Sequence, residues 1–205
     1  MVSRILTRNL FFVCNSANYK SVPPNCRFEI DDAEDEWIFS EKFDYIHGRA
    51  LLSCFKDPAS VLRSAFASLE PGGYLELQDG IFPFKYLGEP PIDSHLYKWN
   101  EIIVEGAAKA GRPWTNSQHY KRWMEEIGFE DVVEKHFFWP TSTWAKGRYF
   151  KQIAVYFQED LMNVLEALSL KVMGVVGWSA EDIQAFVEGV RKDIKDTSIH
   201  AYFPM

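Results

Sequence analysis

The pattern of apolar and polar positions divides the chain into a first half that alternates strands with a helix and a second half that is mostly helical. Short apolar runs at 9–14, 27–30 and 43–46 predict strands. Residues 56–73 predict a helix, because apolar side chains recur at 3.6-residue spacing between a capping aspartate and a Pro-Gly-Gly stop. Residues 74–79 alternate strictly, which predicts another strand. A strand, a helix and a strand in this order form the unit of a parallel sheet.

The second half carries longer amphipathic patterns. Helical spacing predicts four helices, at 94–111, 118–128, 148–173 and 179–195. Short strand patterns occur at 129–140 and 199–203. Because no repeat or linker interrupts the chain, we expect a single domain over residues 1–205. Its sheet core is expected at about 9–80 and 128–140, and its helical cap at about 90–127 and 148–196.

Charge and composition exclude several classes of partner. The net charge is −7 and lysines and arginines do not cluster, which argues against nucleic-acid binding. No segment reaches the roughly 18–20 apolar residues of a membrane span. Cys14, Cys26 and Cys54 lack metal-ligand spacing, so we expect no metal site and free buried thiols in a reducing compartment. The cytoplasm is the expected location, with the nucleus as an alternative.

Polar side chains follow three of the predicted strands, where ligands bind in open α/β sheets. They are Asp31 and Asp32, His47 and Arg49, and Gln78 and Asp79. Asp32 either accepts a hydrogen bond from an adenine amino group or belongs to a solvated acidic turn. His47 is either a general base at the mouth of a pocket or a loop histidine that packs on a neighbouring strand.

Aromatic residues make up 16% of the chain, which suggests either an aromatic-lined cavity or a large aromatic core. As walls of a cavity for an apolar small molecule we consider five tryptophans, namely Trp99, Trp114, Trp123, Trp139 and Trp144. The alternative for each of them is packing between the cap and the sheet.

Three blocks, "IDDAEDEW", "FDYIHGR" and "LEPGGYLELQD", follow one another in a recognisable order. In this order the chain resembles the class I S-adenosylmethionine-dependent methyltransferases, and more closely their fungal branch related to the secondary-metabolism regulator LaeA. The resemblance continues through "AGRPW", "GFEDV", "GWSAEDI" and "IHAY" and covers most of residues 22–203. It implies an α/β fold with a seven-stranded Rossmann-like sheet and a helical cap over the acceptor pocket.

The resemblance also implies roles for individual residues. Asp32 and Ala33 match the family's adenine-contacting pair after the third strand. His47, Gly48 and Arg49 match the segment after the fourth strand, which lies between the cofactor and the acceptor.

The N-terminal segment departs from the family's pattern. The family's first strand ends in a glycine loop that approaches the methionine part of the cofactor, whereas the first glycine in this sequence is Gly48. Where the family's second strand ends in an acid that holds the ribose, this sequence offers Asn15 among its neighbours. We therefore expect a sheet truncated at its first strand and S-adenosylmethionine bound weakly or not at all. The gap either exposes a sheet edge to a homodimer or partner protein, or is partly filled by residues 5–13.

Three functions follow from these features. The missing glycine loop favours a non-methylating enzyme of fungal secondary metabolism, a pericyclase-type catalyst of cyclisation or isomerisation. Such an enzyme would position an apolar natural-product precursor, and His47, Arg49 or Tyr120 would polarise a carbonyl. The alternatives are an active methyltransferase on a small molecule or protein, and a non-catalytic regulatory or binding subunit.

Overall fold

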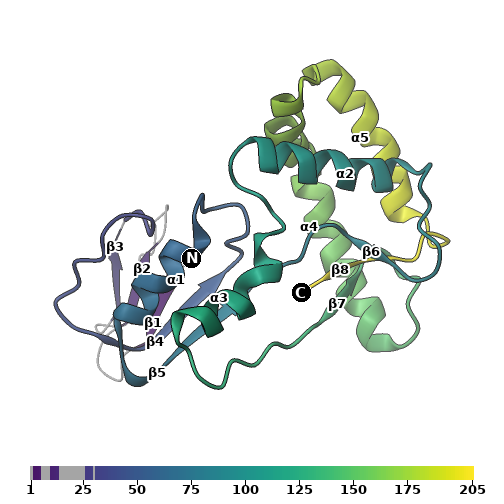
Figure 1. Ribbon diagram of the computed structural model, residues 1–205. Coiled ribbons are helices and arrows are strands. Elements are labelled where there is room, and N and C mark those ends of the chain that lie inside the picture. The colour runs from purple at the N-terminus through teal and green to yellow at the C-terminus, as the bar shows by residue number, and fades with distance from the viewer. Residues whose placement is uncertain (1, 6–9, 14–25, 30) are drawn as a thin grey trace. The chain divides into compact units, whose positions relative to one another are not determined.

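The computed structural model describes residues 2–5, 10–13 and 26–29 by their backbone, and residues 31–205 in full. The chain divides into two compact units (Figure 1). Unit 1 comprises Met1–Asp79 and Gln118–Glu134, and unit 2 comprises Gly80–Ser117 and Lys135–Met205. Residues 118–127 therefore belong with the larger sheet, not with the remaining helices as predicted. That the two units form a single domain stays a prediction.

Unit 1 is built on a five-stranded sheet with the order β3-β2-β1-β4-β5. Its strands are β1 (Val2–Ile5), β2 (Leu10–Val13), β3 (Cys26–Glu29), β4 (Phe43–Arg49) and β5 (Leu69–Gln78). β2 pairs with β3 and β4 pairs with β5 in parallel, while β1 runs antiparallel to both of its neighbours, β2 and β4. The carboxyl ends of β2 to β5 consequently lie at one edge of the sheet.

The central strand β1 was not predicted. Its first residue, Val2, pairs with Val13 of β2 and with Gly48 of β4. The expected gap is thus filled by residues 2–5, while residues 10–13 of the predicted segment 5–13 form the neighbouring strand β2. The sheet edge that we expected at this gap is therefore closed, and the outer strands of this sheet are β3 and β5.

Helix α1 (Pro58–Ala67) covers one face of β4 and β5. It begins where predicted, because Asp57 accepts a hydrogen bond from the backbone N–H of Ser60 at 3.0 Å and proline occupies the first turn. Ala65 packs with Phe43 and Ile46 of β4 in a buried cluster. Phe43 and Ile46 are three residues apart, and an irregularity in the pairing of β4 with β5 between Phe43 and Tyr45 allows both to face α1.

Helix α3 (Tyr120–Ile127) packs beside α1 (Figure 1). The rings of Phe66 and Phe129 meet edge to face with their centroids 4.8 Å apart. Gly128 ends α3 with a φ of 115°, a left-handed conformation that glycine adopts without strain.

Unit 2 combines three long helices with a small sheet. The helices are α2 (His95–Lys109), α4 (Arg148–Met173) and α5 (Ala180–Lys195), close to their predicted bounds. The sheet has the order β6-β8-β7, formed by β6 (Lys85–Tyr86), β7 (Phe138–Pro140) and β8 (Ala201–Pro204). The described strands therefore form one sheet of five and one of three. The predicted α/β fold is confirmed, but the described residues do not form the single seven-stranded sheet that the resemblance implies.

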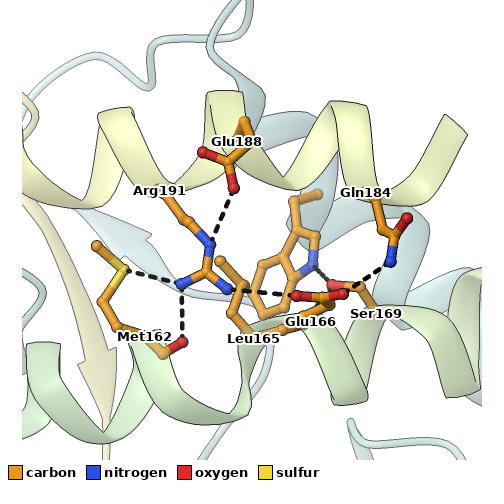
Figure 2. A network of polar contacts seen from close by, with 8 residues as sticks. Met162, Leu165, Glu166, Ser169, Gln184, Glu188 and Arg191 are labelled. Carbon is orange, nitrogen blue, oxygen red and sulfur yellow. Dashed lines mark hydrogen bonds and ion pairs between the residues drawn. The ribbon is translucent and has the colours of Figure 1, made fainter. Parts of the chain in front are cut away.

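Polar contacts join α4 to α5 (Figure 2). The guanidinium of Arg191 donates to the carbonyl oxygen of Met162 at 2.9 Å and lies 3.8 Å from Glu166 and 3.4 Å from Glu188. Deeper in the unit, the buried indole N–H of Trp99 donates to Ser169 at 2.8 Å, and that hydroxyl donates to the carbonyl of Leu165. Among the helices of the described part of the chain, none is both long and apolar enough to cross a membrane.

Candidate functional site

Three segments of unit 1 lie at the carboxyl edge of β3, β4 and β5. The turn 31–37 follows β3, Ala50 and Leu51 follow β4, and Asp79 follows β5. The register of β4 and β5 places Arg49 beside Gln78, so these two strands end together. We call the turn 31–37, Ala50, Leu51, Asp79 and Tyr120 the carboxyl-edge site.

Hydrogen bonds within the turn 31–37 fix its shape. The carbonyl of Asp32 accepts from the N–H of Asp35, and its carboxylate accepts from the N–H of Glu34, both at 3.0 Å. The indole of Trp37 donates to the carbonyl of Ala33 at 3.0 Å. Asp32 itself is exposed, while Ala33 packs against a buried cluster that includes Leu51. The predicted adenine pair thus offers an exposed carboxylate beside an apolar surface, and its binding role stays a prediction.

Glu34 connects this turn to the start of helix α1 by hydrogen bonds. The sequence analysis did not predict this contact. Its Oε1 atom accepts from the backbone N–H of Lys56 at 2.8 Å and of Asp57 at 3.0 Å. In a capping box, a Glu three residues into the helix binds the N–H of the capping residue. That position holds Ser60 in α1, and Glu34 takes its place from a distant part of the chain.

Asp79 joins the ends of both parallel strands to α3. Its Oδ2 atom accepts from the N–H of Leu51 at 3.0 Å and from the hydroxyl of Tyr120 at 3.2 Å. Ala50 has a φ of 55°, a conformation that costs energy for a residue other than glycine and occurs often at functional sites. Burial, and then the nearby charge of Asp79, raise the pKa of Tyr120, which keeps this hydroxyl a neutral donor.

His47 and Arg49 lie within β4 and not in a loop after it. They alternate with Ile46 and Gly48, which face α1, and so project from the opposite face. His47 pairs with Glu76 in the register of the sheet, and its ring stacks on Tyr45 with centroids 6.3 Å apart. Tyr120 lies on the face of the sheet that α1 covers. The three residues predicted to be catalytic, His47, Arg49 and Tyr120, are therefore not brought together.

Gly48 lies at a small cavity under α1. The cavity has a volume of about 20 Å³ and is lined by apolar side chains and by Tyr120. A Cβ atom at Gly48 would come within 2.5 Å of the Leu51 side chain, so close packing explains this glycine. A volume of about 20 Å³ holds roughly one water molecule, so the cavity is too small for a cofactor or a natural product.

The five candidate tryptophans divide between the units. Trp99 and Trp114 are 0% and 5% exposed within unit 2. Trp144 also lies in unit 2 and donates its indole N–H to the carbonyl of Ala201 at 2.9 Å, while Trp139 contacts Phe157. Trp123 lies in unit 1 beside Tyr120. Burial of this kind favours core packing, and a role as substrate walls stays a prediction.

The remaining candidates are cysteines, metal ligands and Asn15. Cys54 is a free thiol but is exposed, so the prediction of a buried thiol is wrong there. Cys14 and Asn15 lie outside the described residues, and Cys26 is described only by its backbone. Across the part of the chain that the structure describes, no three His, Cys, Asp or Glu side chains are grouped to hold a metal ion.

Comparisons with known proteins point to one family. Residues 4–135 match the model of the family described as "Methyltransferase domain". The chain is 29% identical to Methyltransferase pytC of Aspergillus terreus over 88% of its length, and 28% identical to Secondary metabolism regulator LAE1 of Cochliobolus heterostrophus over 89%. It spans only 56% and 62% of these two relatives.

A solved structure is also similar to the chain. This is the phospholethanolamine N-methyltransferase 2 of Haemonchus contortus, in complex with phosphomonomethylethanolamine and S-adenosylhomocysteine. The TM-score is 0.45 at 16% identity, and the similarity covers 88% of this chain and 36% of that one.

Proposed function

Because this chain belongs to the methyltransferase domain family, we propose that it binds the adenosine part of S-adenosylmethionine at the carboxyl-edge site. Its curated relatives are named as methyltransferases and as regulators of secondary metabolism, which supports a methyltransferase-like role for this chain in that metabolism. The reaction proposed for it is methyl transfer to a small molecule.

One observation carries this proposal, namely the way in which the turn 31–37 is held. Its internal hydrogen bonds and its attachment to α1 keep the exposed carboxylate of Asp32 beside the apolar surface of Ala33. An adenine ring needs both features, because its amino group donates a hydrogen bond and its faces are apolar.

Calorimetric titration with adenosine tests this role of Asp32. In Asp32→Asn an amide oxygen can still accept from the N–H of Glu34, but the charge that attracts the adenine amino group is lost. We expect its adenosine affinity to fall about tenfold, which corresponds to one charge-assisted hydrogen bond. Asp35→Asn is the matched control, since Asp35 is an exposed carboxylate of the same turn. Equal affinities for the two variants would contradict the proposal.

The direction of β1 favours a second candidate, the non-methylating cyclisation or isomerisation. Because β1 runs antiparallel to β2 and β4, its carboxyl end lies at the sheet edge opposite the carboxyl-edge site. Ile5 at the end of β1 therefore lies at the edge away from the proposed adenosine site, whereas the family's glycine loop follows its first strand and approaches the methionine part. In this candidate, Tyr120 would have to exchange its bond to Asp79 for a substrate carbonyl.

The ratio of two affinities separates the candidates. Methyl transfer requires contacts to the methionine part, so S-adenosylmethionine should then bind at least about a hundredfold more tightly than adenosine. Equal affinities would mean that the methionine part makes no contact, which favours the non-methylating reaction. Failure of both ligands to bind would overturn the first proposal and leave the regulatory subunit as the better hypothesis.

A further inference from the structure

Glu34 is the residue whose hydrogen bonds attach the turn 31–37 to the next helix. The bonds of Asp32 and Trp37 lie within the turn, so they fix its shape but not its direction. The carboxylate of Glu34, in contrast, reaches across the sequence to the backbone of Lys56 and Asp57. Its negative charge is favourable there, because the N-terminus of α1 carries a partial positive charge.

We propose that Glu34 is a positioning residue that aims the Asp32–Ala33 pair at the adenosine ring, an inference that rests on the proposed function. Without its carboxylate the turn keeps its internal bonds but loses its polar attachment to α1. The contact of Ala33 with the apolar cluster of Leu51 and Phe55 is then no longer supported by hydrogen bonds between the turn and α1. Asp32 would consequently sample several directions, and binding would require that this freedom be lost.

A set of three substitutions separates positioning from simple helix capping. Glu34→Ala removes the acceptor, and we expect adenosine to bind roughly fivefold more weakly, as for one lost hydrogen bond to a charged group. Glu34→Gln keeps an oxygen that can accept the same two N–H groups, so it should restore the affinity to within about twofold of the original. Asp57→Ala removes a different cap from the same helix and leaves the backbone N–H that Glu34 binds.

The melting temperature and the adenosine dissociation constant are measured together for all variants. Glu34→Ala and Asp57→Ala should lower the melting temperature by similar amounts, since each removes one cap of α1. Only Glu34→Ala should weaken adenosine binding. If Asp57→Ala weakens binding equally, Glu34 acts only as a cap. If Glu34→Gln fails to restore binding, the two hydrogen bonds do not position the turn. Either result overturns the inference.

The failure of this inference differs from the failure of the proposed function. If Asp32→Asn weakens adenosine binding and Glu34→Ala does not, the site stands and only the role of Glu34 is wrong. If the unsubstituted protein does not bind adenosine, both are overturned.

Discussion

Unit 2 buries several polar side chains within its core, whereas unit 1 places polar side chains at the strand ends, where they bind the backbone of loops. In unit 2, Trp99, Ser169 and the carbonyl of Leu165 form a chain of hydrogen bonds inside the helices. In unit 1, Glu34 and Asp79 each accept from backbone groups at the carboxyl edge. The difference separates polar groups that stabilise helix packing from polar groups that shape the carboxyl-edge site, where adenosine binding is proposed.

The largest effect should come from the core of unit 2. Leu165 is fully buried, so Leu165→Ala should lower the free energy of unfolding by about 3 kcal/mol through lost burial and an unfilled cavity. Urea unfolding measures the change. Val164→Ala, half exposed on the same helix, should change stability by less than about 0.5 kcal/mol. Similar losses for both would show that α4 is not packed as described.

Removal of one buried hydroxyl should have the next largest effect. Ser169→Ala leaves the indole N–H of Trp99 without its acceptor, which should cost about 2 kcal/mol. In the background of Trp99→Phe, which carries no such donor, the same substitution should cost clearly less. A double-mutant cycle of thermal unfolding measures this coupling, and strictly additive effects would contradict a structural role for the bond.

The contacts of Arg191 shown in Figure 2 should contribute less, because the side chains that make them are partly exposed. Arg191→Met loses the bond to the carbonyl of Met162 and the attraction of two carboxylates, and we expect a loss of about 1 kcal/mol. Lys192→Met, an exposed substitution at the next position of α5, serves as the control in the same denaturation series. An equal loss for both would assign the effect to net charge and not to this network.

A pH dependence from unit 1 should be the smallest effect. Burial, and then the hydrogen bond to Glu76, raise the pKa of Tyr45 from 10.0 to about 12. Stability from the neutral hydroxyl is fully present below pH 10 and is lost as the pH rises toward about 12. Across this interval, Tyr45→Phe should show a shallower fall in melting temperature than the unsubstituted protein. Tyr74→Phe, at an exposed position of β5, should keep the original slope.

Local signals were sufficient to predict much of the fold. The start of α1 at Asp57 and Pro58 and the alternation of β5 follow from neighbouring residues, and both agree with the structure. β1 was missed because its place depends on pairing with β2 and β4 and not on its own four residues. The α/β fold was predicted correctly, but the division of the described strands into two sheets was not, because the pairing of distant strands leaves no local pattern.

The candidate site was predictable only in part. The resemblance located the pair Asp32 and Ala33, which lies at the carboxyl edge as expected. Glu34 and Asp79 were missed because their partners are distant in sequence, and an acidic residue that caps a remote loop looks like any surface carboxylate. His47 was expected at a pocket, but β4 continues to Arg49, and the pleat then places His47 on the face opposite α1.

Hydrogen exchange with and without adenosine tests the central claim most directly, because it reports on both units in one measurement. Adenosine should slow the exchange of backbone amides in the turn 31–37 and at Leu51, and should leave those of α4 and α5 in unit 2 unchanged. Protection confined to unit 2, or no protection in either unit at saturating adenosine, would contradict the assignment of the ligand site to the carboxyl edge.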